Sequence, residues 1–186
     1  MAAMTVGTTV LLWMEAAPAR PLVPLPGLSA KGQGSDNLAD PAVLKTDAPL
    51  QNVKWRQIII HDVGREGLEL AQACHFVIGS ADNAADVAIR PTRLWQAQRD
   101  GHHIFVPGFS FNQSSIGICL MIDAGRAAPS QAMRRSLSSL VRLLQAQFQI
   151  PPDRVYFHSD LGEAGCPGRL FPEDSLRNEL LTPSRR

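Results

Sequence analysis

Charged residues are scarce in this chain: Asp, Glu, Lys and Arg make up 19% of its 186 residues, below the usual quarter. The formal net charge is +1, which argues against a nucleic-acid partner held by a basic face and against a highly charged disordered chain. Cysteine is also rare, and an odd count of three excludes a disulfide framework as the main source of stability. The only tyrosine is Tyr156.

Long hydrophobic runs are missing as well. The apolar run at residues 6–14 is far shorter than the about 20 residues of a membrane-spanning helix, so no transmembrane span is expected. Ala17-Pro18-Ala19 has the small residues of a signal-peptidase site, but no Lys or Arg precedes the run. Residues 1–19 are interpreted as a signal-like segment or a disordered start, and a cell-envelope or secreted location is favoured over a cytoplasmic one.

Composition changes near residue 50. Six of the fourteen prolines lie before this point, whereas none of the five histidines does. Proline-rich chain favours extended conformations and cannot hold a helix. We therefore predict a Pro/Gly-rich linker or disordered arm over residues 20–50 and a compact domain over residues 51–182.

The compact part alternates strand-like and helix-like segments. Ser130 is placed to cap a long helix, whose apolar positions recur three or four residues apart until Pro151. Strands are expected at 55–61, 74–79, 115–122 and 154–158, with weaker candidates at 87–90 and 93–96, and a short closing helix at 174–181. This order predicts an α/β fold with a single mixed β-sheet flanked by helices.

Two of the expected strands end in histidine, His61 and His158, and Cys166 follows within a Gly-Cys-Pro-Gly turn. Strand ends are where α/β sheets place their sites. Two imidazoles and one thiolate suit Zn²⁺, and three protein ligands leave a fourth position open, as in catalytic sites. Spacing alone leaves open the alternative that these are hydrogen-bonded structural side chains.

A set of short motifs occurs in a familiar order, each unspecific by itself. They are Ile-Ile-Ile-His at 58–61, His-Phe-Val-Ile-Gly at 75–79, Asn-Gln-Ser-Ser-Ile-Gly at 112–117, Pro-Pro-Asp-Arg-Val at 151–155 and Cys-Pro-Gly at 166–168. The ordered set, over roughly residues 54–173, resembles the zinc-dependent N-acetylmuramoyl-L-alanine amidases, the family that includes the peptidoglycan recognition proteins.

This resemblance implies a function and a set of site residues. The metal ligands would be His61, His158 and Cys166 around Zn²⁺, and His103 and Asn112 would line or support the substrate groove. The reaction would be hydrolysis of the N-acetylmuramoyl-L-alanine amide bond in peptidoglycan or muropeptides. Zinc suits that reaction because it lowers the pKa of bound water toward ~7 and polarises a carbonyl.

The chain also departs from the family. Cys74 stands where relatives have a tyrosine near the metal, Ala164 stands where they have Lys or Thr, and the segment from His61 to Cys74 is short. These losses favour weakened catalysis or, as the alternative, a non-catalytic peptidoglycan-binding module of the same fold. Two candidates for replacing the lost groups are Glu163, as a general base, and Tyr156, although a solvated loop carboxylate and a sheet residue are the simpler interpretations.

Cysteine 74 allows a further alternative. Its thiol could be a fourth zinc ligand, which would close the site and make the metal structural. Free cysteines more often pack as small apolar side chains, and this is what we expect for Cys74 and for Cys119 in the middle of a strand.

Overall fold

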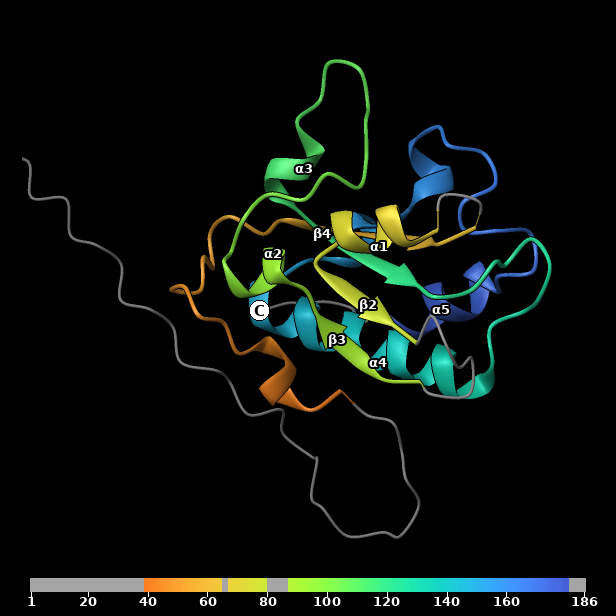
Figure 1. The fold of residues 1–186 in the computed structure, drawn as a ribbon, viewed down its shortest axis with the longest axis horizontal. Coiled ribbons are helices and arrows are strands. Elements are labelled where there is room, and N and C mark those ends of the chain that lie inside the picture. The colour runs from red at the N-terminus through yellow and green to blue at the C-terminus, as the bar shows by residue number, and fades with distance from the viewer. Residues whose placement is uncertain (1–38, 65–66, 80–86, 181–186) are drawn as a thin grey trace, which may run out of the picture.

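The computed structural model describes residues 39–64, 67–79 and 87–180. At its centre lies a single five-stranded sheet in the order β3-β2-β4-β1-β5 (Figure 1). The strands are β1 (Gln57–Asp62), β2 (Phe76–Ile78), β3 (Ile89–Pro91), β4 (Ser115–Leu120) and β5 (Val155–Phe157). Only β3 runs antiparallel to its neighbour, so the predicted mixed sheet is confirmed.

Helices cover both faces of this sheet. The α-helices are α1 (Leu68–Ala73), α2 (Arg93–Gln96), α3 (Phe111–Ser114), α4 (Gln131–Phe148) and α5 (Glu173–Glu179), and the 3-10 helices are η1 (Pro41–Leu44), η2 (Pro152–Arg154) and η3 (His158–Leu161). Helices α4 and α1 lie on opposite sides of the sheet (Figure 1). No helix within the described ranges combines the length and the apolar character needed to cross a bilayer.

The main core lies between the sheet and α4. Ser130 caps this helix as predicted, because its hydroxyl accepts a hydrogen bond from the Met133 N–H at 3.1 Å. The helix ends at Phe148, and the C-cap residue Gln149 has a left-handed φ of 57°. Its apolar stripe, which includes Leu137, Leu140 and Leu144, packs in one core with alternate residues of the central strands. These strand residues are Ile58 and Ile60 of β1 and Ile116 and Ile118 of β4. This packing leaves the other residues of each strand for the opposite face.

The opposite face carries the histidine near the end of β1. Because side chains alternate along a strand, Ile59 and His61 of β1 share this face with their partners Gly117 and Cys119 of β4. Helix α1 covers part of it through a small apolar cluster of Leu70, Ala71, Cys74 and Cys119. None of the three cysteines, all within the described residues, forms a disulfide, and both Cys74 and Cys119 are fully buried.

Three expectations about elements need comment. The segment 93–96 was expected as a weak strand, which was wrong: Gln96 and Ala97 donate hydrogen bonds to the carbonyls of Thr92 and Arg93, and these local bonds close the turn of α2. In place of a strand that continues to residue 158, β5 ends at Phe157 and His158 opens η3. Of the predicted arm, residues 39–50 pack on the domain through buried Leu44, whereas residues 1–38 lie outside the described residues.

Candidate metal centre

The two strand-end histidines lie side by side. Strands β1 and β5 are adjacent and parallel, so their carboxyl ends meet at the same edge of the sheet. His61 is the fifth residue of β1 and fully buried, and His158 directly follows β5. Their Nδ1 atoms are 3.1 Å apart. Sheet topology thus places two imidazole nitrogens at one point.

The loop between η3 and α5 adds a sulfur atom to this pair. The Cys166 Sγ atom lies 3.9 Å from the Nδ1 atom of His61 and also 3.9 Å from the carbonyl oxygen of Asp62. The backbone of Cys166 is fixed beside η3, because its carbonyl accepts a hydrogen bond from Ser159 N–H at 2.6 Å. The ligand atoms of His61, His158 and Cys166 all lie within 4.8 Å of one another.

These three atoms suit a zinc ion in type, and the two separations that involve His61 are close to those of a zinc site. Zinc binds nitrogen at ~2.0 Å and sulfur at ~2.3 Å in a tetrahedral arrangement, which separates ligand atoms by about 3.3–3.6 Å. The distances of 3.1 Å between the nitrogens and 3.9 Å from nitrogen to sulfur differ from these values by a few tenths of an ångström. Within the described part of the chain, these three side chains form the one cluster of this kind, and Cys74 is not in it.

Burial determines the protonation of the ligands in the metal-free chain. The pKa of His61 is lowered to about 3, first by burial and then by the charge of His158. Burial likewise raises the pKa of the Cys166 thiol to about 12. At neutral pH His61 is therefore uncharged, whereas Cys166 carries a proton that a metal would have to displace.

A third histidine supports His61 from behind. The Nδ1 atom of His103 lies 3.1 Å from the Nε2 atom of His61, and its Nε2 atom lies 3.3 Å from the Ser115 hydroxyl. His103 is buried, and burial lowers its pKa well below the usual value. This contact holds the His61 ring so that Nε2 faces His103 and Nδ1 faces His158 and Cys166.

Glycine in the middle of β4 makes room for this supporting ring. A Cβ atom added at Gly117 would lie 2.5 Å from the Cδ2 atom of His103, and one added at Gly101 would lie 2.4 Å from the same atom. Both separations are shorter than real contacts allow. The two glycines are therefore required by the buried histidine and not by a turn.

Asp62 is a site residue that the sequence analysis missed. One oxygen of its buried carboxylate accepts hydrogen bonds from the backbone N–H groups of Ala124 at 2.7 Å and Gly168 at 3.1 Å. This carboxylate therefore joins the cysteine loop to the loop after β4, directly beside the candidate metal ligands. Its position immediately after His61 is a signal that could have identified it.

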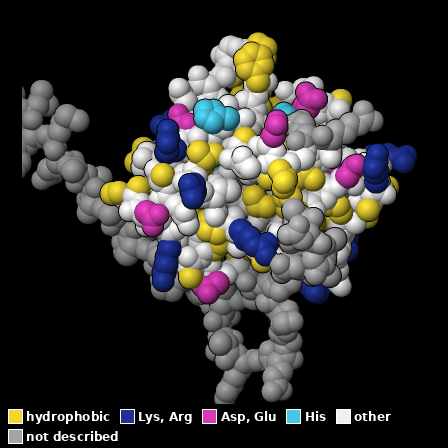
Figure 2. Space-filling model, viewed as in Figure 1, with side chains coloured by type: hydrophobic (Ala, Val, Ile, Leu, Met, Phe, Trp, Pro, Cys, Tyr) yellow, Lys and Arg dark blue, Asp and Glu magenta, His cyan; other side chains and the backbone are white. Residues whose placement is uncertain are grey.

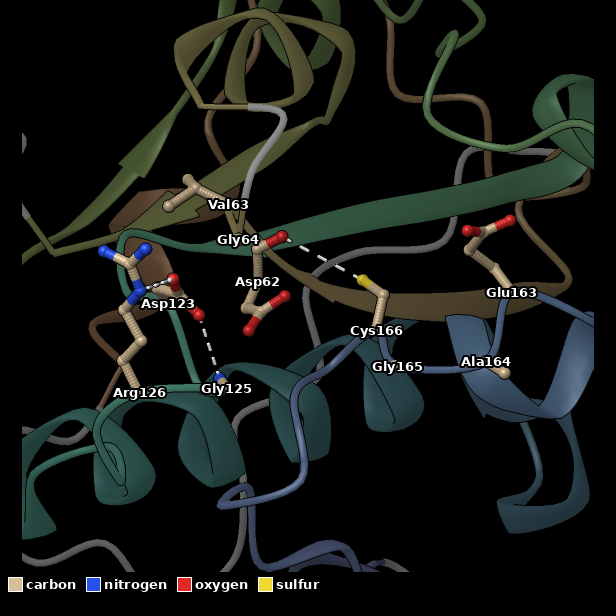
Figure 3. Close-up of a pocket in the computed structure, with 10 residues that line it drawn as sticks. All are labelled: Asp62, Val63, Gly64, Asp123, Gly125, Arg126, Glu163, Ala164, Gly165 and Cys166. Carbon is tan, nitrogen blue, oxygen red and sulfur yellow. Dashed lines mark hydrogen bonds and ion pairs between the residues drawn. The ribbon is translucent and has the colours of Figure 1, made fainter.

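Two cavities border the ligand cluster. A cavity of about 500 Å³ is lined by Asp62, Asp123, Arg126 and Cys166 (Figure 3), and we call it the cysteine cavity. A second, of about 470 Å³, is lined by Glu69, His102, His103, Phe105 and His158, and we call it the histidine cavity. Glu163 lines both. Cys166 thus lines the first cavity and His158 the second, whereas the fully buried His61 lines neither.

The remaining predicted site residues have different surroundings. Asn112 pairs through its side-chain amide with the backbone N–H and carbonyl of Ile104, at 3.2 and 2.7 Å. The half-buried Tyr156 contacts the ring of Phe111, with ring centroids 6.2 Å apart. Ala164 is exposed beside Glu163 in the wall of the cysteine cavity and offers no polar side chain there (Figure 3).

Comparison with solved structures shows where this fold is found. The N-acetylmuramoyl-L-alanine amidase LysC from Clostridium intestinale URNW is 21% identical, with a TM-score of 0.54 over 75% of this chain and 94% of that chain. A mutant endolysin from Bacillus subtilis is 19% identical, with a TM-score of 0.52 over 74% of this chain and 92% of that one. Bumblebee PGRP-SA is 18% identical, with a TM-score of 0.50 over 75% and 92%. At these identities the similarity shows the shared fold.

Comparison at the level of sequence is more specific. No curated protein matches the chain. The family model described as N-acetylmuramoyl-L-alanine amidase, however, matches residues 48–169, which is well over half of the sequence and contains all three candidate metal ligands. The chain belongs to the N-acetylmuramoyl-L-alanine amidase family.

Proposed function

We propose that this chain is a zinc-dependent hydrolase of the amide bond that joins N-acetylmuramic acid to L-alanine in peptidoglycan or muropeptides. The observation that carries the proposal is the convergence of the nitrogen and sulfur atoms of His61, His158 and Cys166 within 4.8 Å. The family supports a substrate of this class. A zinc ion bound there would polarise the scissile carbonyl and lower the pKa of a water molecule.

The chain's own residues would divide the remaining work. His61, His158 and Cys166 would hold the ion, while His103 would orient the His61 ring through its 3.1 Å contact. Glu163 is exposed and lines both cavities, so its carboxylate would accept a proton from the attacking water. The substrate would lie across the cysteine and histidine cavities.

A second candidate function follows from what the site lacks. Cys74 is fully buried in an apolar cluster, and Ala164 carries only a methyl group, so neither supplies the polar contact that relatives have at these positions. Losing one donor to a developing oxyanion typically costs ~10²–10³ in rate. A module that binds peptidoglycan without cutting it is therefore the alternative.

Digestion of purified peptidoglycan separates the two functions. The full chain and a His158→Ala variant would be incubated with the polymer, and free L-alanine amino groups and bound zinc would be measured. Hydrolysis predicts release by the wild type, one zinc per chain, and loss of both in the variant. Retention on peptidoglycan without release would instead establish the binding module, and a chain that takes up no zinc would refute the zinc-dependent hydrolase.

Replacing His103 should weaken metal binding without touching a ligand. We expect His103→Ala to lower zinc affinity about 10–100-fold, since a ligand histidine that loses its outer partner is less well oriented. Competition with a chromogenic chelator would measure this. His102→Ala is the matched control, because this exposed neighbour lines the histidine cavity and should leave zinc affinity unchanged. Equal zinc affinities for the two variants would contradict the role given to His103.

Zinc uptake should also release protons. At pH 7.5 the Cys166 thiol, with a pKa of about 12, is protonated, and zinc binds the thiolate, so its uptake should displace about one proton from this group. His61, with a pKa of about 3, is already neutral at this pH and releases no proton when zinc binds. Calorimetry in buffers of different ionisation enthalpy measures the number of protons released when zinc binds.

A conservative ligand change provides the control for this proton count. Cys166→Asp keeps a zinc ligand that is already ionised at neutral pH, so its zinc uptake should displace one proton fewer than that of the wild type. For the wild type, zinc affinity should rise with pH below the pKa of the thiol, by up to ~10-fold per pH unit. Equal proton release by both chains would show that Cys166 does not bind the ion as a thiolate.

A further inference from the structure

A short loop of unusual composition stands beside the histidine cavity. Residues 104–110, which we call the aromatic loop, connect buried His103 to α3 and project from the body of the domain (Figure 1). Two of its side chains, Phe105 and Phe109, are 86% and 69% exposed. Figure 2 shows hydrophobic surface at the outer end of this projection.

The loop is held in this position at its base. The Asn112 side chain donates to the carbonyl of Ile104 and accepts from its N–H, which clamps the two ends together. At the tip, Phe109 N–H donates to the carbonyl of Val106 at 3.0 Å, and Gly108 supplies the positive φ of 80° that the turn needs. The exposed rings are thus presented by an ordered turn.

Phe105 and Phe109 leave most of their apolar surface in water, although the ring of Phe109 contacts that of Phe111, with centroids 5.7 Å apart. Burying such a side chain is favourable, and exposed apolar surface of this kind commonly marks a contact site. Phe105 also lines the histidine cavity together with the candidate ligand His158. A molecule that reaches the metal centre through this cavity would therefore meet the aromatic loop.

The charge of this region restricts the partner. Residues 101–122 contain no Asp, Glu, Lys or Arg. Phosphate groups and anionic lipid surfaces are recruited by clustered basic side chains, which this segment does not have. The loop instead suits an uncharged partner that has an apolar face and polar edges.

We infer that the aromatic loop is a stacking platform for the sugar rings of the glycan strand. A pyranose ring presents one face of C–H bonds, which are weakly positive and pack well on the negative face of an aromatic ring, while its hydroxyl groups stay in water. In the amide-linked substrate the lactyl carboxyl is neutral, in keeping with the uncharged loop. The inference rests on the proposed function, and it names the substrate as glycan-linked peptide, not as free stem peptide.

Titration with a peptide-free saccharide tests the platform independently of hydrolysis. The probe is an uncharged tetrasaccharide of N-acetylglucosamine, which has neither a lactyl carboxyl group nor an amide bond to L-alanine. Calorimetry with the full chain should show binding that Phe105→Ala and Phe109→Ala each weaken by about tenfold. Phe105→Trp, which keeps an aromatic ring at this position, should bind the saccharide about as tightly as the wild type. Val53→Ala is the control, since Val53 is 78% exposed and lines neither the cysteine cavity nor the histidine cavity.

The outcomes separate this inference from the proposed function. If L-alanine is not released but Phe105→Ala still weakens saccharide binding, hydrolysis fails and the platform stands. If the wild type hydrolyses peptidoglycan but binds no saccharide, or binds it as tightly after Phe105→Ala, the platform is refuted. Cosedimentation with phosphatidylethanolamine and phosphatidylglycerol vesicles that is lost in Phe105→Ala, without saccharide binding, would assign the loop to a membrane and overturn the inference.

Discussion

A His61→Ala chain is expected to bind no zinc and to lose amidase activity by ~10³-fold or more. His61 contacts both other members of the cluster, with its Nδ1 atom 3.1 Å from His158 and 3.9 Å from Cys166. Its removal leaves two candidate ligands, which we expect to be too few to retain the ion. The chain then loses a Lewis acid that stabilises the transition state by several kcal/mol. Each 1.36 kcal/mol corresponds to a tenfold change in rate. Elemental analysis and release of L-alanine amino groups measure the two effects.

His75 provides the matched control for this change. It is fully buried, its Nδ1 atom accepts a hydrogen bond from Gly117 N–H at 2.9 Å, and its Nε2 atom lies 3.0 Å from the carbonyl oxygen of Arg99. His75→Ala should therefore lower the free energy of unfolding through two lost buried hydrogen bonds, about 1–3 kcal/mol each, while one zinc per chain is retained. A His61→Ala chain that still binds one zinc would remove His61 from the ligand set.

The ligand pair could be anticipated from the sequence, and the physical reason is simple. A strand that is apolar throughout, such as residues 58–60, must be buried on both faces, so the histidine that follows it lies at an edge of the sheet. Two such strands, if adjacent and parallel, bring their histidines together. The resemblance supplied that adjacency, and the sheet order confirms it.

What the sequence could not provide depends on tertiary contacts. In the sequence, Gly117 looks like an ordinary strand residue, and only the structure shows that the ring of His103 packs against its Cα. Phe105 resembles the core phenylalanines in type, and only the turn at Gly108 explains why it is exposed. The four residues of α2 are too few for a helical period to be visible, so their local hydrogen bonds could not be inferred.

Asp62 shows how the remaining ligand is positioned. Cys166 lies more than a hundred residues from His61 in sequence, in a loop that is not a strand of the sheet, so side-chain contacts must fix that loop to the sheet. The Asp62 carboxylate does so by accepting the Gly168 N–H at 3.1 Å and the Ala124 N–H at 2.7 Å. At Gly168 the two loops pack so closely that an added Cβ would lie 2.1 Å from the backbone nitrogen of Gly125.

Asp62→Ala should therefore destabilise the metal-free chain by roughly 3–5 kcal/mol, because two buried N–H groups each lose a charged acceptor worth about 1.5–3 kcal/mol. Urea unfolding of chelator-treated protein measures this loss. Asp62→Asn keeps one acceptor oxygen, so its free energy of unfolding should lie between those of the wild type and Asp62→Ala. Asp153→Ala removes an exposed carboxylate and should leave the free energy of unfolding unchanged. Zinc affinity should fall with the same order of variants, since a displaced loop carries Cys166 away from His61 and His158. If Asp62→Ala were as stable as Asp153→Ala, the two hydrogen bonds would not be what holds the cysteine loop in place.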